Sequence, residues 1–389
     1  MVLRGKNLKS KINTMKLSVL QENLNHGLNT VSRSVSTKAQ LPVLANVLIA
    51  TDQGRLKLSA TNLETGINFW LGAKIETQGA ISIPAKNLTE YIASLPAEKV
   101  NLEVKENQLY LSCGNYQAKF VGLPASEFPN VPTLSGKPEI SLSVEDLGLA
   151  ISQVAFAAAQ DEGRPVLTGV LVQAKEDKLT LVATDGYRLS LKTIEGLKEM
   201  KNLEIFQKGL LIPSRTLTEV GKIITSGNGE TDLGIKVTPE ENQIIFANKS
   251  SEVISRLIEG KFPDFEKILP EKEIAKVVVD KEDLTRAVRM AAIFARESAN
   301  IVRLEVTKTK LKVTANAAQV GDNVSEIEAK IEGEGGKIAF NSRYLLDFLN
   351  TVDAELISFG MTTALNPGVF SAVGDKSFLH IIMPVRVQE

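Results

Sequence analysis

Two acidic sites in this 389-residue sequence have the residue types that general acid–base catalysis requires. Asp185 follows an alternating apolar run in LVATDGYRLSL, and Asp161 stands beside Glu162 in QDEGRP. Both stretches have the composition of turns, because Gly, Asp and Pro favour tight bends of the backbone. A catalytic Asp185 would need a neighbouring acid, base or metal, and the sequence indicates none. We therefore interpret Asp185 and Gly186 as turn residues, with a hydrolase that uses Asp185 and Asp161 as the alternative.

Other catalytic and metal-binding patterns are missing from the sequence. One cysteine, Cys113, and two histidines, His26 and His380, exclude a disulfide framework and a Cys/His zinc cluster. The stretch GEGGKI at 333–338 lacks the leading Gly and the Ser/Thr of a phosphate-binding loop, so it is interpreted as a turn. We predict no catalytic residue, no metal, no cofactor and no enzymatic activity.

The elements that position Asp185 recur twice elsewhere in the chain. The segments NVLIATDQGRLKLSAT, GVLVQAKEDKLTLVAT and IVRLEVTKTKLKVTAN align without gaps. Each alternates apolar and polar residues around a short polar turn, which is typical of a half-buried β-hairpin. Asn62 occupies the position of Asp185 in the first copy, and Ala317 occupies it in the third. The local structure therefore does not require a carboxylate.

Helix signals flank each hairpin in the same order. Before the hairpins, Glu22, Glu145 and Glu282 each stand at the start of an amphipathic helix with apolar residues at i, i+4, i+7 and i+11. After the hairpins, IPAKNLTEYIASL, IPSRTLTEVGKII and FNSRYLLDFLNTV predict second helices. The apolar stripes of the first helices are Leu24-Leu28-Val31-Val35, Leu147-Ile151-Val154-Ala158 and Leu284-Val288-Ala291-Ala295.

This repetition predicts an α+β fold of three similar domains, each with two helices packed on antiparallel sheets. The periodic pattern begins at Met15, so residues 1–14 are expected to form a flexible extension. The predicted domains are 15–135, 138–262 and 270–389, joined at SGKP and near FPDFEKILP. No stretch has the ~18 consecutive apolar residues of a membrane helix, and the N-terminus lacks the apolar segment of a signal peptide. A cytoplasmic protein is expected.

Basic residues recur at matching places although the formal net charge is only −1. In the third copy, Arg286 and Arg289 fall opposite the apolar stripe of the first helix. Lys86, Arg215 and Arg343 each lie near the start of a second helix, where the helix macrodipole disfavours a cation by about 0.3–1 kcal/mol. For any one residue alone, an ordinary solvated helix face is the preferred interpretation. Their recurrence points to an external anion.

Five motifs in matching order and spacing resemble one known family. They are LPVLANVLI, ATDGYRL, LPASEFPN, GKFPDFEKILP and IIMPVRV, and the resemblance runs from Met15 to about Val387. In these motifs the chain resembles the bacterial DNA polymerase III beta subunit, the sliding clamp. The resemblance implies a head-to-tail homodimer whose six domains close a ring around duplex DNA, with helices lining the hole. It also implies a non-catalytic processivity factor. The alternatives to a clamp are the hydrolase and a non-ring adaptor built from the same domains.

The resemblance also implies which residues face DNA and which join the two subunits. A ring held by closure needs only loose, sequence-independent phosphate contacts. The expected contact between subunits joins Phe120 of the first domain to Ile293 and Phe294 of the third. By resemblance and helix placement, the DNA-facing candidates are Arg33, Lys38, Lys86, Arg164, Arg215, Arg286, Arg289 and Arg343.

In the resembled family, the ATDG-x-RL turn, the joint between the second and third domains and the C-terminal strand form an apolar groove. This groove receives short linear peptides from the polymerase III catalytic subunit, the clamp loader and other replication and repair proteins; no membrane partner is expected. An apolar trough with a few directional polar groups suits such peptides, and Met adapts to varied partners. In this sequence the groove would comprise Leu167, Thr184, Gly186, Tyr187, Arg188, Leu189, Pro263, Lys267, Ile268, Ile381, Ile382, Met383, Pro384, Val385 and Arg386.

Overall fold

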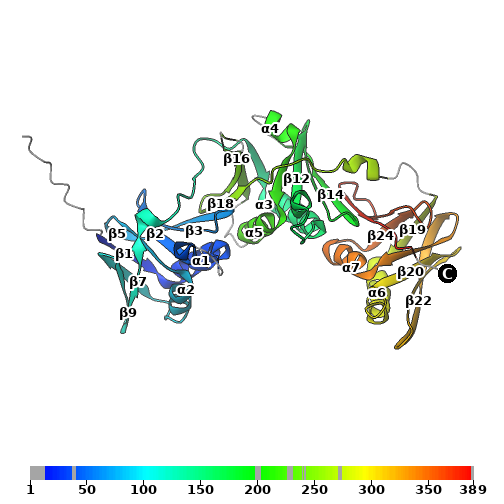
Figure 1. The fold of residues 1–389 in the computed structure, drawn as a ribbon, viewed down its shortest axis with the longest axis horizontal. Coiled ribbons are helices and arrows are strands. Elements are labelled where there is room, and N and C mark those ends of the chain that lie inside the picture. Colours follow the sequence, from blue (N-terminus) through cyan, green and yellow to red (C-terminus); the bar gives the residue numbers. More distant parts are fainter. Residues whose placement is uncertain are drawn as a thin grey trace, which may run out of the picture. The chain divides into compact units, whose positions relative to one another are not determined.

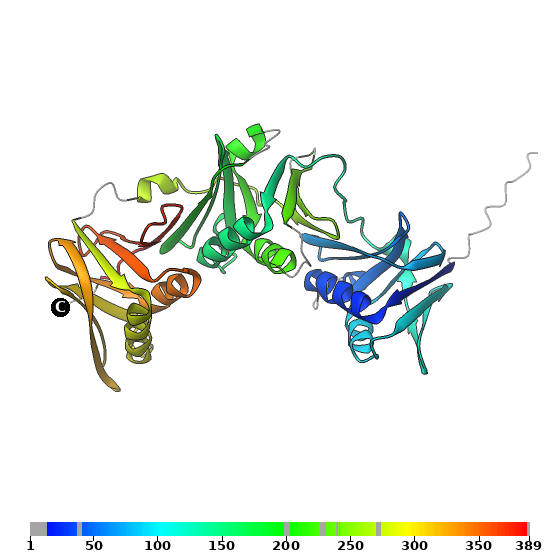
Figure 2. The ribbon, with the colours of Figure 1, turned by 180° about the vertical axis from the view of Figure 1, so that it is seen from behind.

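A computed structural model describes residues 14–36, 41–197, 203–225, 231–238, 240, 242–269 and 274–386. The chain divides into two compact units. The first is formed by Met1–Glu139 with Gly227–Arg256, and the second by Ile140–Ser226 with Leu257–Glu389. Figures 1 and 2 show the ribbon of both units from opposite sides.

The first unit is built from antiparallel strands and two described α-helices. Its elements are β1 (Thr14–Leu20), α1 (Gln21–Val31), η1 (Ser32–Ser34), η2 (Pro42–Ala45), β2 (Asn46–Asp52), β3 (Arg55–Thr61), β4 (Thr65–Leu71), β5 (Lys74–Thr77), β6 (Ala80–Pro84), α2 (Ala85–Ala93), β7 (Lys99–Lys105), β8 (Gln108–Cys113), β9 (Tyr116–Val121), β10 (Leu123–Pro124), η3 (Ala125–Glu127), β16 (Asp232–Val237), β17 (Gln243–Ala247) and β18 (Ser251–Arg256).

These strands form two sheets. One has the order β5-β1-β7-β8-β9, and within this unit the other runs β10-β6-β2-β3-β4-β18-β17-β16. The hairpin β2–β3 turns at Gln53 and Gly54, whose φ angles of 47° and 79° are both positive. Two positive φ angles define the tight hairpin turns whose twist matches that of the strands. Helix α1 packs against α2 and against β4, so the helices cover one face of the larger sheet.

The second unit contains the other two copies of the repeat. Its elements are β11 (Ile140–Ser143), α3 (Val144–Val154), η4 (Ala155–Ala157), η5 (Pro165–Thr168), β12 (Gly169–Lys175), β13 (Lys178–Thr184), β14 (Arg188–Ile194), α4 (Leu203–Lys208), β15 (Leu210–Pro213), α5 (Ser214–Thr225), η6 (Phe265–Ile268), β19 (Ala275–Asp280), α6 (Lys281–Ala295), β20 (Ile301–Val306), β21 (Lys310–Ala317), β22 (Gly321–Gly333), β23 (Gly336–Asn341), α7 (Ser342–Thr351), β24 (Leu356–Met361), β25 (Gly368–Ala372) and β26 (Phe378–Ile382).

One sheet joins both copies, in the order β15-β12-β13-β14-β26-β25-β24-β19-β22-β21-β20-β23. Helix α3 packs on α5, and α6 packs on α7 (Figure 2). Beneath α6 and α7 lies the largest aromatic group of this unit, in which the ring of Phe370 contacts those of Phe340, Phe348 and Phe359 at 4.7–5.8 Å between centroids. Aromatic pairs at this spacing contribute beyond the area they bury. None of the described helices is long and apolar enough to cross a membrane.

The predicted α+β fold of repeated helix–hairpin–helix copies is confirmed. Two helices nevertheless end earlier than the apolar stripes predicted, because α1 passes into η1 before Val35 and α3 passes into η4 before Ala158. All four stripe residues of α6 lie inside that helix and are buried. Helix α4 was not predicted, and it has no counterpart in the described residues of the other copies. Thr14, assigned to the flexible extension, is the first residue of β1, and the remainder of the extension lies outside the described residues.

Side-chain caps explain where three of the predicted helices begin. The Ser143 hydroxyl accepts from the first amides of α3, the Asp280 carboxylate accepts from Asp283 N at 3.0 Å, and the Asn341 amide oxygen accepts from Arg343 N at 2.9 Å. Each cap satisfies backbone donors that have no partner inside the helix and contributes about 1 kcal/mol. The residues before α1 and α2, Leu20 and Pro84, provide no such bond.

Candidate functional site

Three of the predicted DNA-facing residues occupy equivalent positions at helix starts. Lys86, Arg215 and Arg343 are the second residues of α2, α5 and α7, and all three are exposed. Within the described part of the chain, none of them forms an ion pair. The partial positive charge of each helix start adds to the side-chain charge, although in α7 the Arg343 N–H is already bonded to Asn341. Each of these places therefore favours an external anion.

Helix α6 carries two further predicted residues on its exposed side. Arg286 donates from Nη1 to Asp283 at 3.1 Å, and Arg289 donates from Nη2 to the amide oxygen of Asn350 at 3.1 Å. A hollow of about 440 Å³ lies beside them between α6 and α7. Exposed ion pairs are typically worth ~0–1 kcal/mol, so Arg286 can exchange Asp283 for a phosphate at little cost.

The remaining predicted DNA-facing residues are placed differently. Arg33 is exposed in η1 of the first unit, and Lys38 lies outside the described residues. Arg164 is exposed, but its Nη2 donates to the carbonyl oxygen of Asp185 at 3.0 Å. Part of its hydrogen-bonding capacity therefore supports the turn that follows β13.

The turn at Thr184–Arg188 is held by two short polar side chains. The Thr184 hydroxyl donates to Arg188 O at 2.6 Å and accepts from Gly186 N at 3.0 Å. The Asp185 Oδ1 accepts from Tyr187 N at 2.8 Å and from Arg188 N at 3.0 Å. Side chains of Asp and Thr stabilise turns in this way. The interpretation of Asp185 as a turn residue is thus supported by both of its Oδ1 bonds.

Arg188 ties this turn to the helices behind it. Its Nε donates to Asp185 Oδ2 at 3.1 Å, its Nη2 donates to Phe156 O at 2.7 Å, and its Nη1 donates to Asp347 of α7. The guanidinium also lies 4.5 Å from the centre of the Tyr344 ring. Only 9% of the side chain is exposed. Arg188 therefore connects the turn to Phe156 and α7 from a buried position beneath the predicted groove.

His380 lies next to Arg188 and was not predicted to have a role. It is fully buried, its Nδ1 is 2.6 Å from Ser190 Oγ, and its ring stacks on Phe348 at 5.5 Å between centroids. Burial, and then the charge of Arg188, lower the pKa of His380 to about 3. The ring is therefore neutral at physiological pH. The alternation of FLHII, which places Phe378, His380 and Ile382 on one face of β26, was the signal for its burial.

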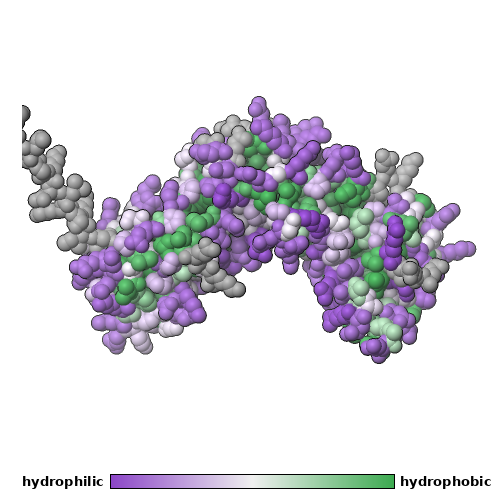
Figure 3. Space-filling model, in the orientation of Figure 1, coloured by the Kyte–Doolittle hydropathy of each residue, from purple (hydrophilic) through white to green (hydrophobic). Residues whose placement is uncertain are grey.

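The predicted groove residues meet along β14, β26 and η6. Leu189 and Ile381 face each other across β14 and β26, and Ile268 packs on the same apolar cluster. Met383 N donates to Tyr187 O at 2.8 Å, which brings two exposed apolar side chains together. Figure 3 shows green apolar patches near the position of β14 in Figure 1.

These residues differ in how much of each remains accessible. Lys267 forms an exposed pair with Asp264 at 2.8 Å, and Val385 N donates to Ala339 O at 2.8 Å. Buried side chains form the floor, and exposed ones are left to contact a ligand. The buried members are Leu167, Thr184, Arg188, Leu189, Ile381 and Ile382, the half-buried ones are Ile268, Pro384 and Val385, and the exposed ones are Gly186, Tyr187, Pro263, Lys267, Met383 and Arg386.

The predicted subunit-contact residues lie near two open sheet edges. Phe120 is on β9, the last strand of its sheet, and its ring meets that of Tyr91 edge-on at 5.7 Å. Ile293 on α6 is 59% exposed, whereas Phe294 packs against the core of the second unit. Residues 321–328 of β22 pair with β21, and the opposite edge of that stretch has no partner among the described strands.

Nearly the whole chain is similar in sequence to members of a single protein family. Family models described as the N-terminal, central and C-terminal domains of the DNA polymerase III beta subunit match residues 15–132, 141–264 and 266–386. The beta sliding clamp of Synechococcus elongatus is 32% identical over 379 residues, covering 96% of this chain and 100% of that protein. The clamp of a Synechocystis species is 30% identical over 393 residues, covering 96% and 100%.

Solved structures show the same fold. The DNA polymerase sliding clamp of Bacillus subtilis is 26% identical with a TM-score of 0.89, and covers 96% of this chain and 100% of its own. A beta sliding clamp of C. crescentus, with polyethylene glycol bound to a region proposed to tether the beta motif, is 27% identical with a TM-score of 0.88 and the same coverage.

Proposed function

Because the chain belongs to the DNA polymerase III beta subunit family, the sliding clamps, we propose which of its residues perform the work of a clamp. The protein is a DNA sliding clamp and a non-catalytic processivity factor. Clamps of this family form rings as dimers, and they bind DNA, polymerase and other clamp-binding proteins. The hydrolase and the non-ring adaptor are not supported. We assign the three domains to 15–135, 138–262 and 270–389 and place the protein in the cytoplasm, where bacterial chromosomes are replicated.

The proposed DNA contacts are Arg33, Lys38, Lys86, Arg164, Arg215, Arg286, Arg289 and Arg343. One observation carries the assignment: Lys86, Arg215 and Arg343 are exposed cations at the same position of three repeated helices, and none of them pairs with an acidic side chain among the described residues. Loose contacts to phosphates are independent of sequence and sensitive to salt. That is the behaviour a sliding ring needs, since closure of the ring keeps it on the DNA.

The test compares two triple variants loaded on circular DNA. Lys86→Glu, Arg215→Glu and Arg343→Glu together are expected to weaken retention and to reduce the slope of log affinity against log salt by about one unit per lost phosphate contact. The control replaces three exposed lysines on sheet strands, Lys74, Lys99 and Lys276, by Glu, which changes the net charge equally. Equal retention and equal salt slopes for the two variants would remove the assignment.

The proposed partner groove rests on the exposed apolar pair of Tyr187 and Met383 above a buried floor. The floor of Leu189 and Ile381 fixes the shape, and Arg188 holds it against α7. A flexible Met beside an aromatic ring suits peptides of varied sequence. The C. crescentus clamp, in which a ligand occupies a region proposed to tether the beta motif, supports a ligand-binding role for a groove of this kind.

The subunit contact follows from the way the repeats pair. In the first copy, β4 follows the hairpin β2–β3 and pairs with β18. In the second copy, β14 follows the hairpin β12–β13 and pairs with β26. The corresponding stretch of the third copy is 321–327 of β22, whose open edge would pair with β9 of a second chain. Phe120, Ile293 and Phe294 lie beside these edges, and exposed edges are where strands of another chain add.

A further inference from the structure

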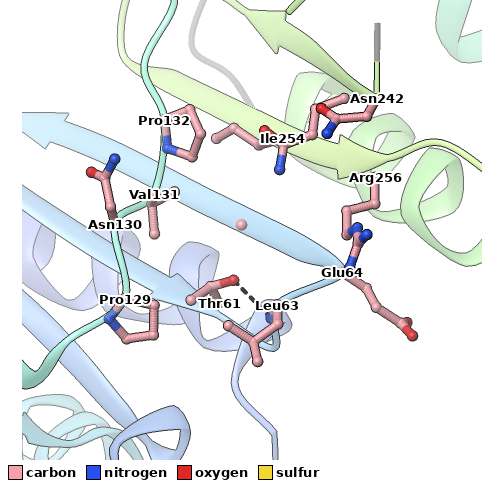
Figure 4. Close-up of a pocket in the computed structure, with 12 residues that line it drawn as sticks. Thr61, Leu63, Glu64, Pro129, Asn130, Val131, Pro132, Asn242, Ile254 and Arg256 are labelled. Carbon is pink, nitrogen blue, oxygen red and sulfur yellow. Dashed lines mark hydrogen bonds between the residues drawn. The ribbon is translucent and has the colours of Figure 1, made fainter. Parts of the chain in front are cut away.

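A second cavity, of about 350 Å³, lies in the first unit where β4 meets β18 (Figure 4). It is lined by the turn after β3, the segment Pro129–Pro132, residues 242–243 at the start of β17 and the end of β18. In Figure 4 these segments face one another, with Thr61, Leu63, Val131 and Ile254 around the hollow. None of the predicted groove, DNA or subunit-contact residues lines it.

The turn beside this cavity repeats the turn of the partner groove. The Thr61 hydroxyl donates to Thr65 O at 3.0 Å and accepts from Leu63 N at 3.0 Å. The Asn62 side-chain oxygen accepts from Glu64 N at 3.0 Å and from Thr65 N at 2.7 Å. Each bond has its counterpart, between the same backbone and side-chain positions, in the turn of Thr184–Arg188.

The strand beside each turn is paired in the same register. Gly66 faces Ile254 across β4 and β18, as Leu189 faces Ile381 across β14 and β26. Arg256 N donates to Glu64 O at 2.9 Å. The same bond runs from Met383 N to Tyr187 O in the partner groove. Arg256 therefore stands where the partner groove has its exposed methionine.

The floor of the cavity also repeats. Phe128, Val131 and Ile254 form one buried cluster, in the positions that Phe262, Phe265 and Ile381 hold around the partner groove. A Cβ atom at Gly66 would lie 2.8 Å from Val131 Cγ1, so glycine is needed for the 129–132 segment to close over β4. The first unit thus repeats the backbone of the partner groove and part of its floor, with Gly66 in the place of Leu189.

The side chains on the rim give this cavity a different chemistry. Leu63 is held at a φ of 75° and is 49% exposed, so an apolar side chain is fixed at the edge in a strained conformation. Arg256 is exposed and forms no ion pair among the described residues. The Glu64 side chain points away from the other labelled residues in Figure 4. The rim therefore offers an apolar wall beside one unpaired cation.

We propose that this cavity is a second peptide-binding groove, for an extended segment of a partner protein in which an aliphatic side chain adjoins a carboxylate. The aliphatic group would sit against Leu63, Val131 and Ile254, and the carboxylate would take the guanidinium of Arg256. Arginine pairs with carboxylates by directed, charge-assisted hydrogen bonds. Because the site differs from the partner groove, one chain would hold two peptides of different sequence at once, which raises the effective concentration of a bivalent partner.

Methyl NMR of the full-length protein tests this proposal with two synthetic hexapeptides, Gly-Ser-Leu-Asp-Ser-Gly and the same peptide with Asn for Asp, both blocked at their ends. The aspartate peptide is expected to shift the methyl signals of Leu63, Val131 and Ile254. Replacing Asp by Asn, or Arg256→Gln, is expected to weaken binding about tenfold, as loss of a charge-assisted bond does. Leu63→Gly removes the apolar wall while relieving the strained φ, so it should weaken binding in a folded protein.

Two controls separate this site from the partner groove. Met383→Ala is expected to leave binding of the aspartate peptide unchanged, because Met383 is not among the residues that line this cavity. Binding that is lost in Met383→Ala but kept in Arg256→Gln would place the peptide in the partner groove and overturn the proposal. Shifts of the same size for both peptides, or no shift near Leu63 at millimolar peptide, would overturn it too. None of these outcomes bears on the DNA contacts or on the clamp function.

Discussion

The turns at Asn62–Thr65 and Asp185–Arg188 have the same hydrogen bonds but support different surroundings. In each, a Thr hydroxyl and an Asx side chain hold the backbone, and the strand that follows pairs with a strand from a later repeat. The last residue differs. Arg188 extends into the interior and contacts Phe156 and Asp347, whereas the first turn has the shorter Thr65 at this position.

This difference separates what the repeat supplies from what each copy adds. The bend requires only an acceptor at the second position and a Thr before it, so Asn62 and Asp185 serve equally. Arg188 adds a connection from the turn to η4 and α7, with a neutral His380 packed beside it. These contacts anchor the turn of the partner groove to η4 and α7.

Removal of the Arg188 side chain should have the largest effect on the stability of the turn in the second unit. Arg188→Ala leaves the carbonyl of Phe156 and the carboxylate of Asp185 without their buried partner. Loss of one member of a buried ion pair costs about 3–5 kcal/mol, and the lower end applies because Asp347 is 43% exposed. Native-state hydrogen exchange should show β14 amides opening more easily by about 3 kcal/mol. Thr65→Ala is the matched control. An equal effect of this variant on the β4 amides would contradict the proposed anchoring role of Arg188.

Low pH is expected to lower the stability of the second unit through His380, which has no titratable counterpart at the equivalent position, Val253, of the first unit. The pKa of His380 is lowered to about 3 in the folded chain, so its stabilising effect is complete above the ordinary pKa of 6.5 and is lost as the pH falls toward 3. Between pH 7.5 and 5 the unfolded chain gains a proton that the folded chain does not, which lowers the free energy of unfolding by about 2 kcal/mol. Hydrogen exchange of β26 at the two pH values measures this loss.

The control for the acid effect comes from the first unit. Val253 stands where His380 stands, since both lie one residue before the strand position that faces Gly66 or Leu189. His380→Val should lower stability at pH 7.5, because Ser190 loses its partner, but it should abolish the loss of stability that His380 causes between pH 7.5 and 5. An unchanged slope in the variant would show that other groups cause it.

Much of this architecture was predictable, because hairpins and amphipathic helices leave a period in the sequence. The ends of α1 and α3 were not. Serine side chains follow α1, with Ser34 Oγ donating to Val31 O at 3.0 Å, and such local bonds compete with the helix. After α3, the carbonyl of Phe156 turns to Arg188, a contact between residues 32 positions apart that no local pattern reveals.

The sites were predictable in part, for a similar reason. Alignment of the repeats located the helix-start cations, because their positions are set by local sequence. It also showed that Asn62 replaces Asp185, which argued against catalysis but equally indicated a second turn of the same kind. The cavity beside Leu63 went unnoticed because its walls come from residues 61–66, 129–132, 242–243 and 254–256, which are far apart in the chain. The burial of Arg188 likewise depends on α7 and η4, which only the folded chain brings together.

Substitutions of Asp185 test whether the two turns depend on the same side-chain hydrogen bonds. Asp185→Ala removes the acceptor of two backbone amides and should lower the stability of β14 by about 1–2 kcal/mol. Asp185→Asn should recover most of that loss, because Asn62 accepts the same two bonds in the first unit. Hydrogen exchange of the turn amides distinguishes the variants. If Asp185→Asn were as damaging as the alanine variant, the ion pair with Arg188 would outweigh the turn bonds.

The third position of the two turns provides the smallest and most symmetric test. Leu63 and Gly186 both have positive φ, at 75° and 92°, where a side chain costs roughly 1–2 kcal/mol. Leu63→Gly should therefore raise the stability of the first unit by no more than about 1 kcal/mol, because glycine loses more freedom on folding. Gly186→Leu should lower that of the second by at least as much, since a Cβ there would lie 3.1 Å from Arg164 Nη1. Chemical denaturation of the two variants, monitored by exchange in β4 and β14, gives both values. Opposite signs would show that Leu63 is kept at the cavity rim at the expense of stability, as a residue selected for binding would be; a loss in both would mean that its packing against the cavity walls outweighs the strain.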